Sequence, residues 1–144
     1  MNKLVERKNI FKTKKYFDSF ESICKYEFVE DMKDLFSWHK EVIKDFNKID
    51  RVKFFPTFSV ENDIDFNSFW EKIDNIISSC SAIFYMIKNG ILVRVTVDKI
   101  KYFIQECFEK QNSYDAFLMF LNPSKIVAFC ENEYDVDFLC VSDE

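Results

Sequence analysis

The sequence predicts an α+β fold in which N-terminal helices pack on a mainly antiparallel sheet of about five strands. Three observations indicate this class. Apolar residues recur at helical spacing through the first third of the chain. Short runs rich in β-branched and aromatic residues then alternate with further helical stripes. The dipeptide Asn89-Gly90 stands between two apolar runs, a pattern typical of a tight antiparallel hairpin.

The N-terminal third is predicted to be helical. From about Thr13 to Tyr26 the apolar residues fall at helical spacing, and Thr13 is a candidate cap for the start of this helix. A stronger amphipathic helix is predicted from Phe28 to about Lys48, with His39 on its apolar face.

The next two elements are predicted to be a strand and a helix. The run from Val52 to Val60 has the composition of a strand, but Pro56 removes a backbone donor and so favours a position at the sheet edge or a bulge. An apolar stripe from Phe66 to Cys80 then predicts a helix.

The second half of the chain is predicted to contain two hairpins. The strands 82–88 and 91–97 flank Asn89-Gly90, where the only glycine of the chain supplies the positive φ of a type I′ turn. Asp98 is a candidate cap for a short helix that ends near Phe108. Strands 114–121 and 126–131 follow, and 132–141 either continues the last strand or forms another.

The segment E-N-E-Y-D-V-D, residues 131–137, has a carboxylate at every second position. If it is extended, its four acids lie on one face of a strand, about 7 Å apart, and repel one another. A cationic partner would relieve that repulsion. We therefore predict a partner-binding surface, which includes Asp63 and Asp65 of a second acidic cluster; its residues are Glu131, Glu133, Tyr134, Asp135, Asp137, Asp63 and Asp65.

Three interpretations of the acidic segment stay open. It is a solvated strand face that discourages aggregation, a protein-binding face without intervening bases, or a Mg²⁺ or Mn²⁺ site completed by a residue of another strand such as Asp115. Strand spacing disfavours a single tight metal site, because neighbouring acids stand too far apart to share one ion. For Asp63 and Asp65, helix capping is the alternative to a partner contact.

Composition excludes several function classes. The net charge of −5 disfavours direct nucleic-acid binding, and the low content of glycine argues against a phosphate-binding loop or a dinucleotide fingerprint. No run is suited to a signal peptide or a membrane span, so we expect a cytoplasmic protein without membrane contact. The five scattered cysteines have no paired spacing and are interpreted as small buried hydrophobic residues with free thiols.

Positive charge is concentrated at the start of the chain. Only Glu6 opposes a group of bases in this region, which comprises Lys3, Arg7, Lys8, Lys12, Lys14 and Lys15. Residues 1–12 are interpreted as a mobile basic arm. The alternatives are an RNA-contacting arm and a positive patch for a second partner.

No catalytic motif stands out. The single histidine, His39, is interpreted as a structural residue rather than a catalytic one, because it lies on an apolar helix face. No nucleophile elbow, zinc spacing or phosphate loop is present. We therefore expect a protein that is not an enzyme and needs no cofactor or metal.

The chain is short and acidic, is rich in Phe, Ile, Asn and Lys, and has the acidic C-terminal stretch CENEYDVDFLCVSDE. In these respects it resembles the small immunity proteins of bacterial contact-dependent growth inhibition and related polymorphic toxin systems. The resemblance implies an antitoxin that neutralises a cognate toxin domain in a one-to-one cytoplasmic complex. It carries over no functional residue.

The expected function is thus an immunity protein that binds a basic toxin domain, such as a nuclease, through an acidic surface, with Tyr134 as an aromatic anchor. The chain itself is expected to be a monomer or a weak homodimer. Two alternatives remain: a metal-dependent hydrolase or nuclease using the C-terminal carboxylates, and a phage-encoded or regulatory interaction protein.

Overall fold

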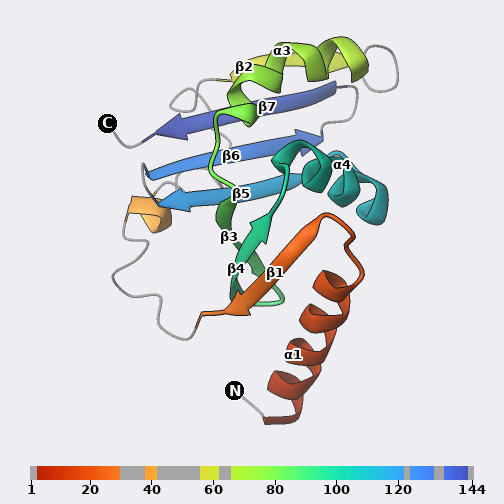
Figure 1. Cartoon of the computed structure of the whole chain (residues 1–144), viewed down its shortest axis with the longest axis vertical. Coiled ribbons are helices and arrows are strands. Elements are labelled where there is room, and N and C mark those ends of the chain that lie inside the picture. Colours follow the sequence, from red (N-terminus) through yellow and green to blue (C-terminus); the bar gives the residue numbers. More distant parts are fainter. Residues whose placement is uncertain are drawn as a thin grey trace.

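The computed structural model describes residues 3–29, 38–41, 56–61, 66–121, 124–131 and 135–142. Residues 38–41 are helical. The labelled elements are α1 (Lys3–Asp18), β1 (Ile23–Phe28), β2 (Pro56–Glu61), α3 (Phe66–Ser78), β3 (Ile83–Lys88), β4 (Ile91–Val97), α4 (Ile100–Gln111), β5 (Ala116–Leu121), β6 (Ser124–Glu131) and β7 (Asp135–Ser142). They confirm the predicted α+β class (Figure 1).

The described strands form one sheet of seven strands in the order β1-β4-β3-β5-β6-β7-β2, and every pairing is antiparallel. The sheet is strongly twisted, since β1, β4 and β3 run steeply across the direction of β5, β6 and β7 (Figure 1). It has more strands than the five or so expected, because residues 23–28 are a strand and residues 135–142 form a strand of their own.

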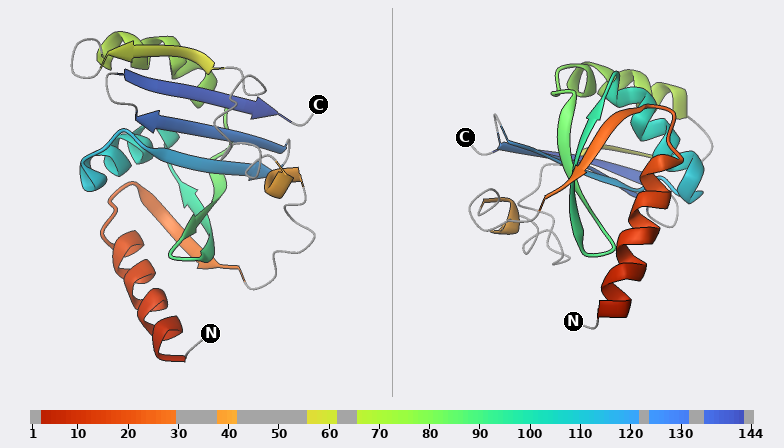
Figure 2. Two further views of the ribbon diagram at one scale, coloured as in Figure 1. Left: turned by 180° about the vertical axis from the view of Figure 1, so that it is seen from behind. Right: turned by 60° about the horizontal axis from the view of Figure 1, so that its bottom comes forward.

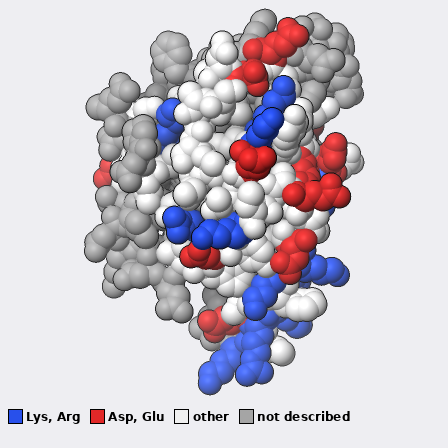
Figure 3. Space-filling model, viewed as in Figure 1, with Lys and Arg blue, Asp and Glu red and all other residues white. Residues whose placement is uncertain are grey.

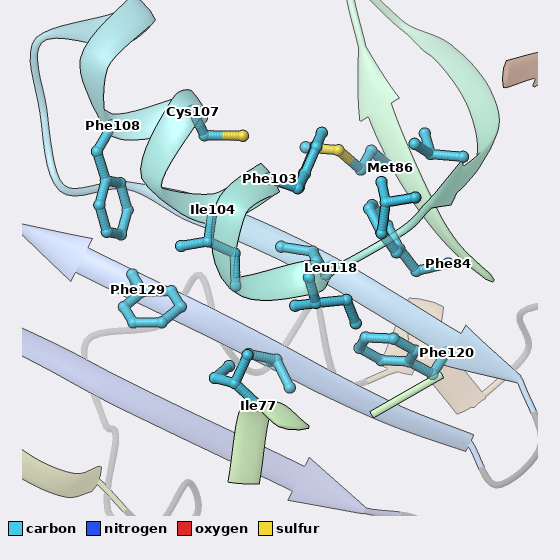
Figure 4. Close-up of a cluster of buried hydrophobic side chains, with 14 of the residues drawn as sticks. Ile77, Phe84, Met86, Phe103, Ile104, Cys107, Phe108, Leu118, Phe120 and Phe129 are labelled. Atoms are coloured by element: carbon cyan, nitrogen blue, oxygen red, sulfur yellow. The ribbon is translucent and has the colours of Figure 1, made fainter. Parts of the chain in front are cut away.

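All three labelled helices contribute to one core on one face of the sheet. Figure 4 shows Ile104 of α4 on the side of Leu118 of β5, and Phe103 beside Met86 of β3. Phe103 is fully buried, with its ring centroid 5.2 Å from that of Phe20 and 5.0 Å from that of Phe84. Phe103 therefore packs α4 against both the segment that follows α1 and the sheet.

The opposite face of the sheet has a smaller core, which contains Leu92, Met119, Ile126, Ala128 and Leu139. His39 is buried, and its Nε2 donates a hydrogen bond to the Phe120 carbonyl at 2.8 Å. The neighbouring Trp38 packs against the same core. His39 thus links the helical segment 38–41 to β5, which fits its interpretation as a structural residue.

The predicted helix from Thr13 to Tyr26 is wrong at both ends. Helix α1 already includes Lys3 and ends at Asp18, and residues 23–28 pair with β4 instead. The side chains of β1 alternate between half-buried Tyr26 and Phe28 and exposed Lys25 and Glu27. Pairing with a neighbouring strand has overridden the local helical spacing.

The N-terminal residues have a defined place in the fold. Residues 3–12, interpreted from sequence as a mobile arm, form the first part of α1. Thr13 does not cap the helix. It is buried in the middle, where its hydroxyl donates to the Asn9 carbonyl at 2.7 Å and accepts a hydrogen bond from Asn89 Nδ2 at 3.1 Å.

The Asn89-Gly90 hairpin is confirmed. Asn89 and Gly90 have φ values of 53° and 75°, and β3 and β4 pair in register up to Lys88 and Ile91. Asp98 is not the cap of α4, because the N-cap is Lys99 and makes no side-chain hydrogen bond there.

The segment between β1 and α3 is described only in part. Strand β2 covers the second part of the run predicted from Val52 to Val60, and among the described strands it is an edge strand with an irregular register near Pro56, as predicted; residues 52–55 lie outside the described residues. Of the helix predicted from Phe28 to Lys48, Phe28 belongs to β1 and 38–41 is helical, while 30–37 and 42–48 lie outside the described residues. None of the described helices is long and apolar enough to cross a membrane.

Candidate functional site: an acidic groove at the end of α4

A groove of about 570 Å³ lies where α4 meets the end of β6. Its walls come from the last turns of α4, the loop that follows and the last residue of β6; the lining residues are Gln105, Phe108, Glu109, Asn112, Ser113, Tyr114 and Glu131. We call this feature the acidic groove.

The loop on one side of the groove is fixed by the end of α4. Asn112 has a left-handed φ of 52°, and its N–H donates to the Phe108 carbonyl. The N–H of Ser113 reaches the same carbonyl at 3.3 Å. A left-handed residue after a helix is a common stop signal that asparagine tolerates, so the sequence itself sets the direction in which Tyr114 leaves the helix.

The floor of the groove is aromatic. Phe108 is buried, and its ring makes edge contacts with Tyr114 at 5.5 Å and with Phe129 at 5.3 Å between centroids. Trp70 of α3 packs behind both Phe108 and Phe129. Because these rings belong to the main core, the floor is held by the same packing that stabilises the fold.

Two exposed carboxylates, Glu109 and Glu131, line the groove. The backbone of Glu131 is anchored, because its N–H donates to Asp115 Oδ1 at 2.9 Å. The Asp115 carbonyl in turn accepts a hydrogen bond from Gln111 Nε2 at 2.7 Å. These bonds join the end of α4, the loop and the end of β6, so that Glu131 is presented by a fixed backbone.

Among the described residues that line this groove there is no lysine or arginine. Lys110, next to Glu109 in the chain, lies 3.9 Å from the Glu106 carboxylate and 5.2 Å from the centre of the Phe20 ring, on the α1 side of the helix. Other hollows over the described residues have Lys25, Lys99 or Lys101 in their walls. In Figure 3 many basic side chains gather over α1, while both acidic and basic side chains lie around α4.

The expectation that four acids lie on one face of one strand is wrong. Glu131 is the last residue of β6, whereas Asp135 and Asp137 belong to β7, which runs antiparallel to it. Glu131 pairs with Val136, which is in the helix-side core, and Asp137 pairs with Cys130 on the opposite face. The side chains of Glu131 and Asp137 therefore point to opposite sides of the sheet.

The other predicted partner-binding residues are not brought to the groove by any described contact. Asp135 starts β7 and pairs with Glu61 of β2, while Asp137 is half-buried. Glu133, Tyr134, Asp63 and Asp65 lie outside the described residues.

Among the described residues, no group of three His, Cys, Asp or Glu side chains is placed to hold a metal ion. Asp115, named from sequence as a helper of such a site, instead binds the Glu131 backbone. The structure thus assigns Asp115 a role in shaping the groove.

The sequence did not single out Glu109 or the aromatic floor. In the structure the β5–β6 register runs to Leu121↔Ser124, and its extension places Tyr114 opposite Glu131. The strand bounds predicted from the sequence, 114–121 and 126–131, do not give this register. The position of α4 over that pair comes only from tertiary packing.

Comparison with known proteins gives no relative: no family model, curated protein or solved structure matches the chain.

Proposed function

We propose that the protein is a cytoplasmic immunity protein that neutralises a cognate toxin domain, and that its acidic groove receives a lysine or arginine side chain of that toxin. The observation that carries the proposal is a concave, preformed site with exposed carboxylates at Glu109 and Glu131 and no base among its described lining residues. A cationic side chain is the complement of such a site.

The chemistry of the lining supports a cation in particular. A guanidinium or ammonium group can bind a carboxylate through charge-assisted hydrogen bonds. Its alkyl stem can pack on an aromatic ring, and the ring face attracts the charge. Tyr114 lines the groove beside the two acids, and Phe108 forms its base.

Rigidity of the groove supports tight binding. The hydrogen bonds from Gln111 to Asp115 and from Glu131 to Asp115 already hold the backbone in place. A preformed site loses less conformational freedom on binding than a flexible one. A single binding face on a stable domain is sufficient for an inhibitor.

A nuclease is the class of toxin that fits best. Nucleases need cationic surfaces to hold phosphates, and an acidic inhibitor finds such a surface quickly through long-range attraction. The net charge of −5 of this chain favours the same encounter.

The proposal is tested by growth rescue. The C-terminal domain encoded by the upstream neighbouring reading frame is induced in a bacterial host, with this protein co-expressed as wild type, as Glu109→Lys/Glu131→Lys or as Glu71→Lys. Glu71 is an exposed residue of α3 outside the groove and serves as the matched charge control.

We expect wild type and Glu71→Lys to restore growth and the groove variant to fail while accumulating as folded protein. Equal rescue by all three would exclude the groove from the mechanism. A neighbouring domain that is harmless, or whose toxicity wild type leaves unchanged, would count against the immunity function itself.

A further inference from the structure

Among the described strands, β1 forms one edge of the sheet and has backbone groups that no described strand pairs with. Its one described pairing is with β4, and the Val29 N–H donates to the Leu92 carbonyl at 2.9 Å. Antiparallel ladders bond at alternate residues, so Lys25 and Glu27 also bond toward β4. The N–H and C=O groups of Tyr26 and Phe28 therefore point out of the sheet, and the described residues provide no hydrogen bond to them.

The outer side of β1 is accessible. The side chains of Lys25 and Glu27 are 63% and 53% exposed, and Cys24 is exposed as well. The last turn of α1 contacts β1 through side chains: the Tyr26 hydroxyl donates to Asp18 Oδ1 at 2.6 Å, and the Tyr26 ring centroid lies 5.4 Å from that of Phe17. No hydrogen bond from the described part of α1 reaches the backbone groups of Tyr26 or Phe28. Figures 1 and 2 show β1 at the rim of the sheet.

The charges of β1 are complementary to a second copy of the same strand. If two copies pair antiparallel with Tyr26 opposite Tyr26, Lys25 of each stands opposite Glu27 of the other, giving two attractive cross-strand pairs. A shift of the register that centres Lys25 or Glu27 places like charges directly opposite. The Tyr26-centred register uses the outward-pointing backbone groups of Tyr26 at its centre and places those of Phe28 opposite Cys24 of the other copy.

We propose that the protein forms a symmetric homodimer through β1, with Tyr26 on the two-fold axis and the two sheets joined into one antiparallel sheet. Such an isologous contact is closed, because each copy uses its single β1 edge. It also protects an edge that would otherwise invite unspecific pairing. The acidic groove stays open, since β4, β3 and β5 separate β1 from β6.

The decisive experiment uses two charge reversals, Lys25→Glu and Glu27→Lys. Alone, each variant places like charges opposite one another in both symmetric pairs. Mixed together, they form a heterodimer in which every pair is again attractive, although the Lys25–Glu27 ion pair within each chain remains broken. Sedimentation velocity and mass measurement across a range of concentrations give the dissociation constants.

We expect wild type to dimerise, each single variant to dimerise at least about tenfold more weakly, and the mixture to regain near wild-type dimerisation. Glu71→Lys, on α3 at the other end of the sheet, is expected to dimerise as wild type. Circular dichroism confirms that each variant is folded before mixing.

Hydrogen exchange gives an independent measurement on the unmodified chain. Protection of the Tyr26 and Phe28 amides is expected to rise with protein concentration. A wild type that stays monomeric, a mixture that fails to recover dimers, or open-ended assemblies that indicate β1 pairing with β2 of another copy would each overturn the proposal.

Discussion

The carboxylate of Glu106 binds Ser22 twice, through the Ser22 N–H at 2.9 Å and the Ser22 hydroxyl at 2.6 Å, both to Oε1. Its other oxygen accepts the N–H of Glu21 at 2.7 Å. One side chain of α4 therefore satisfies the turn between α1 and β1, and it fixes where the edge strand β1 begins.

Replacing Glu106 by Gln is expected to lower the free energy of unfolding by about 1–2 kcal/mol, because an amide cannot accept all of these hydrogen bonds. Chemical denaturation measures the change. Glu109→Gln, one residue along the helix and exposed, is the matched control and is expected to stay within about 0.5 kcal/mol of wild type. Equal changes in the free energy of unfolding for the two variants would show that Glu106 does not anchor the turn between α1 and β1.

The same contact predicts a pH dependence. Burial alone raises the pKa of Glu106, but the hydrogen bonds from Ser22 and Glu21 and the charge of Lys110 outweigh it, so that the pKa lies below its ordinary value. A carboxyl group whose pKa is lower in the folded state stabilises the fold at pH above its pKa in the unfolded chain, about 4.3. This stabilisation is lost as the pH falls through the pKa of the folded state. The free energy of unfolding of wild type should therefore fall as the pH drops below about 4.3. The fall should be smaller in Glu106→Gln.

Phe103 is expected to be the most sensitive core position of α4. It is fully buried between Phe20 and Phe84, so Phe103→Ala should cost about 3–5 kcal/mol through lost burial and a new cavity. The neighbouring Tyr102 is 55% exposed, and Tyr102→Ala should cost less than about 1 kcal/mol. Thermal unfolding compares the pair, and a Phe103 variant as stable as the Tyr102 variant would contradict the described core.

The cysteines are expected to differ sharply in reactivity. The interpretation that all five are buried holds only for Cys107, since Cys24 is exposed and Cys80, Cys130 and Cys140 are half-buried. Burial raises the pKa of Cys107 to about 12. A thiol reagent should modify Cys24 in the native protein and Cys107 only after unfolding, because the thiolate is the reactive form. Peptide mapping after a timed pulse checks this order, and early labelling of Cys107 would speak against its place in the core.

The sequence predicts best those helices and strands whose own residues have a strong pattern. Asn89-Gly90 specifies its hairpin because positive φ is required at both residues. Helix α3 and strands β3–β6 follow from strong apolar periodicity. Residues 23–28 were assigned to the wrong class because Ile23 and Tyr26 suit a helix stripe as well as a strand, and only pairing with β4 decides between the two.

The candidate site was predictable only in part. Glu131 was identified from its acidic neighbourhood, but alternating carboxylates do not reveal where a strand ends, and the break between β6 and β7 places Glu131 and Asp137 on opposite faces. Glu109 and Tyr114 come close to Glu131 through the packing of α4 on the sheet. Long-range contacts of this kind leave no local pattern in the sequence.

Divalent metal is expected to leave the protein unaffected. The alternative of a metal-dependent hydrolase requires carboxylates that converge on one ion, whereas Glu131 and Asp137 diverge across the sheet. The melting temperature should be the same with EDTA, Mg²⁺ or Mn²⁺. A saturable increase of the melting temperature with either metal would support the metal-dependent hydrolase instead.

The most direct measurement of the central claim is the affinity of the purified protein for the proposed toxin domain, the one encoded by the upstream neighbouring reading frame, at low and high salt, by calorimetry. Wild type should bind less tightly as salt rises. Glu109→Lys/Glu131→Lys should lose at least about tenfold in affinity and much of that salt dependence, while Glu71→Lys stays close to wild type. An affinity and a salt dependence left unchanged by the double reversal would contradict the account.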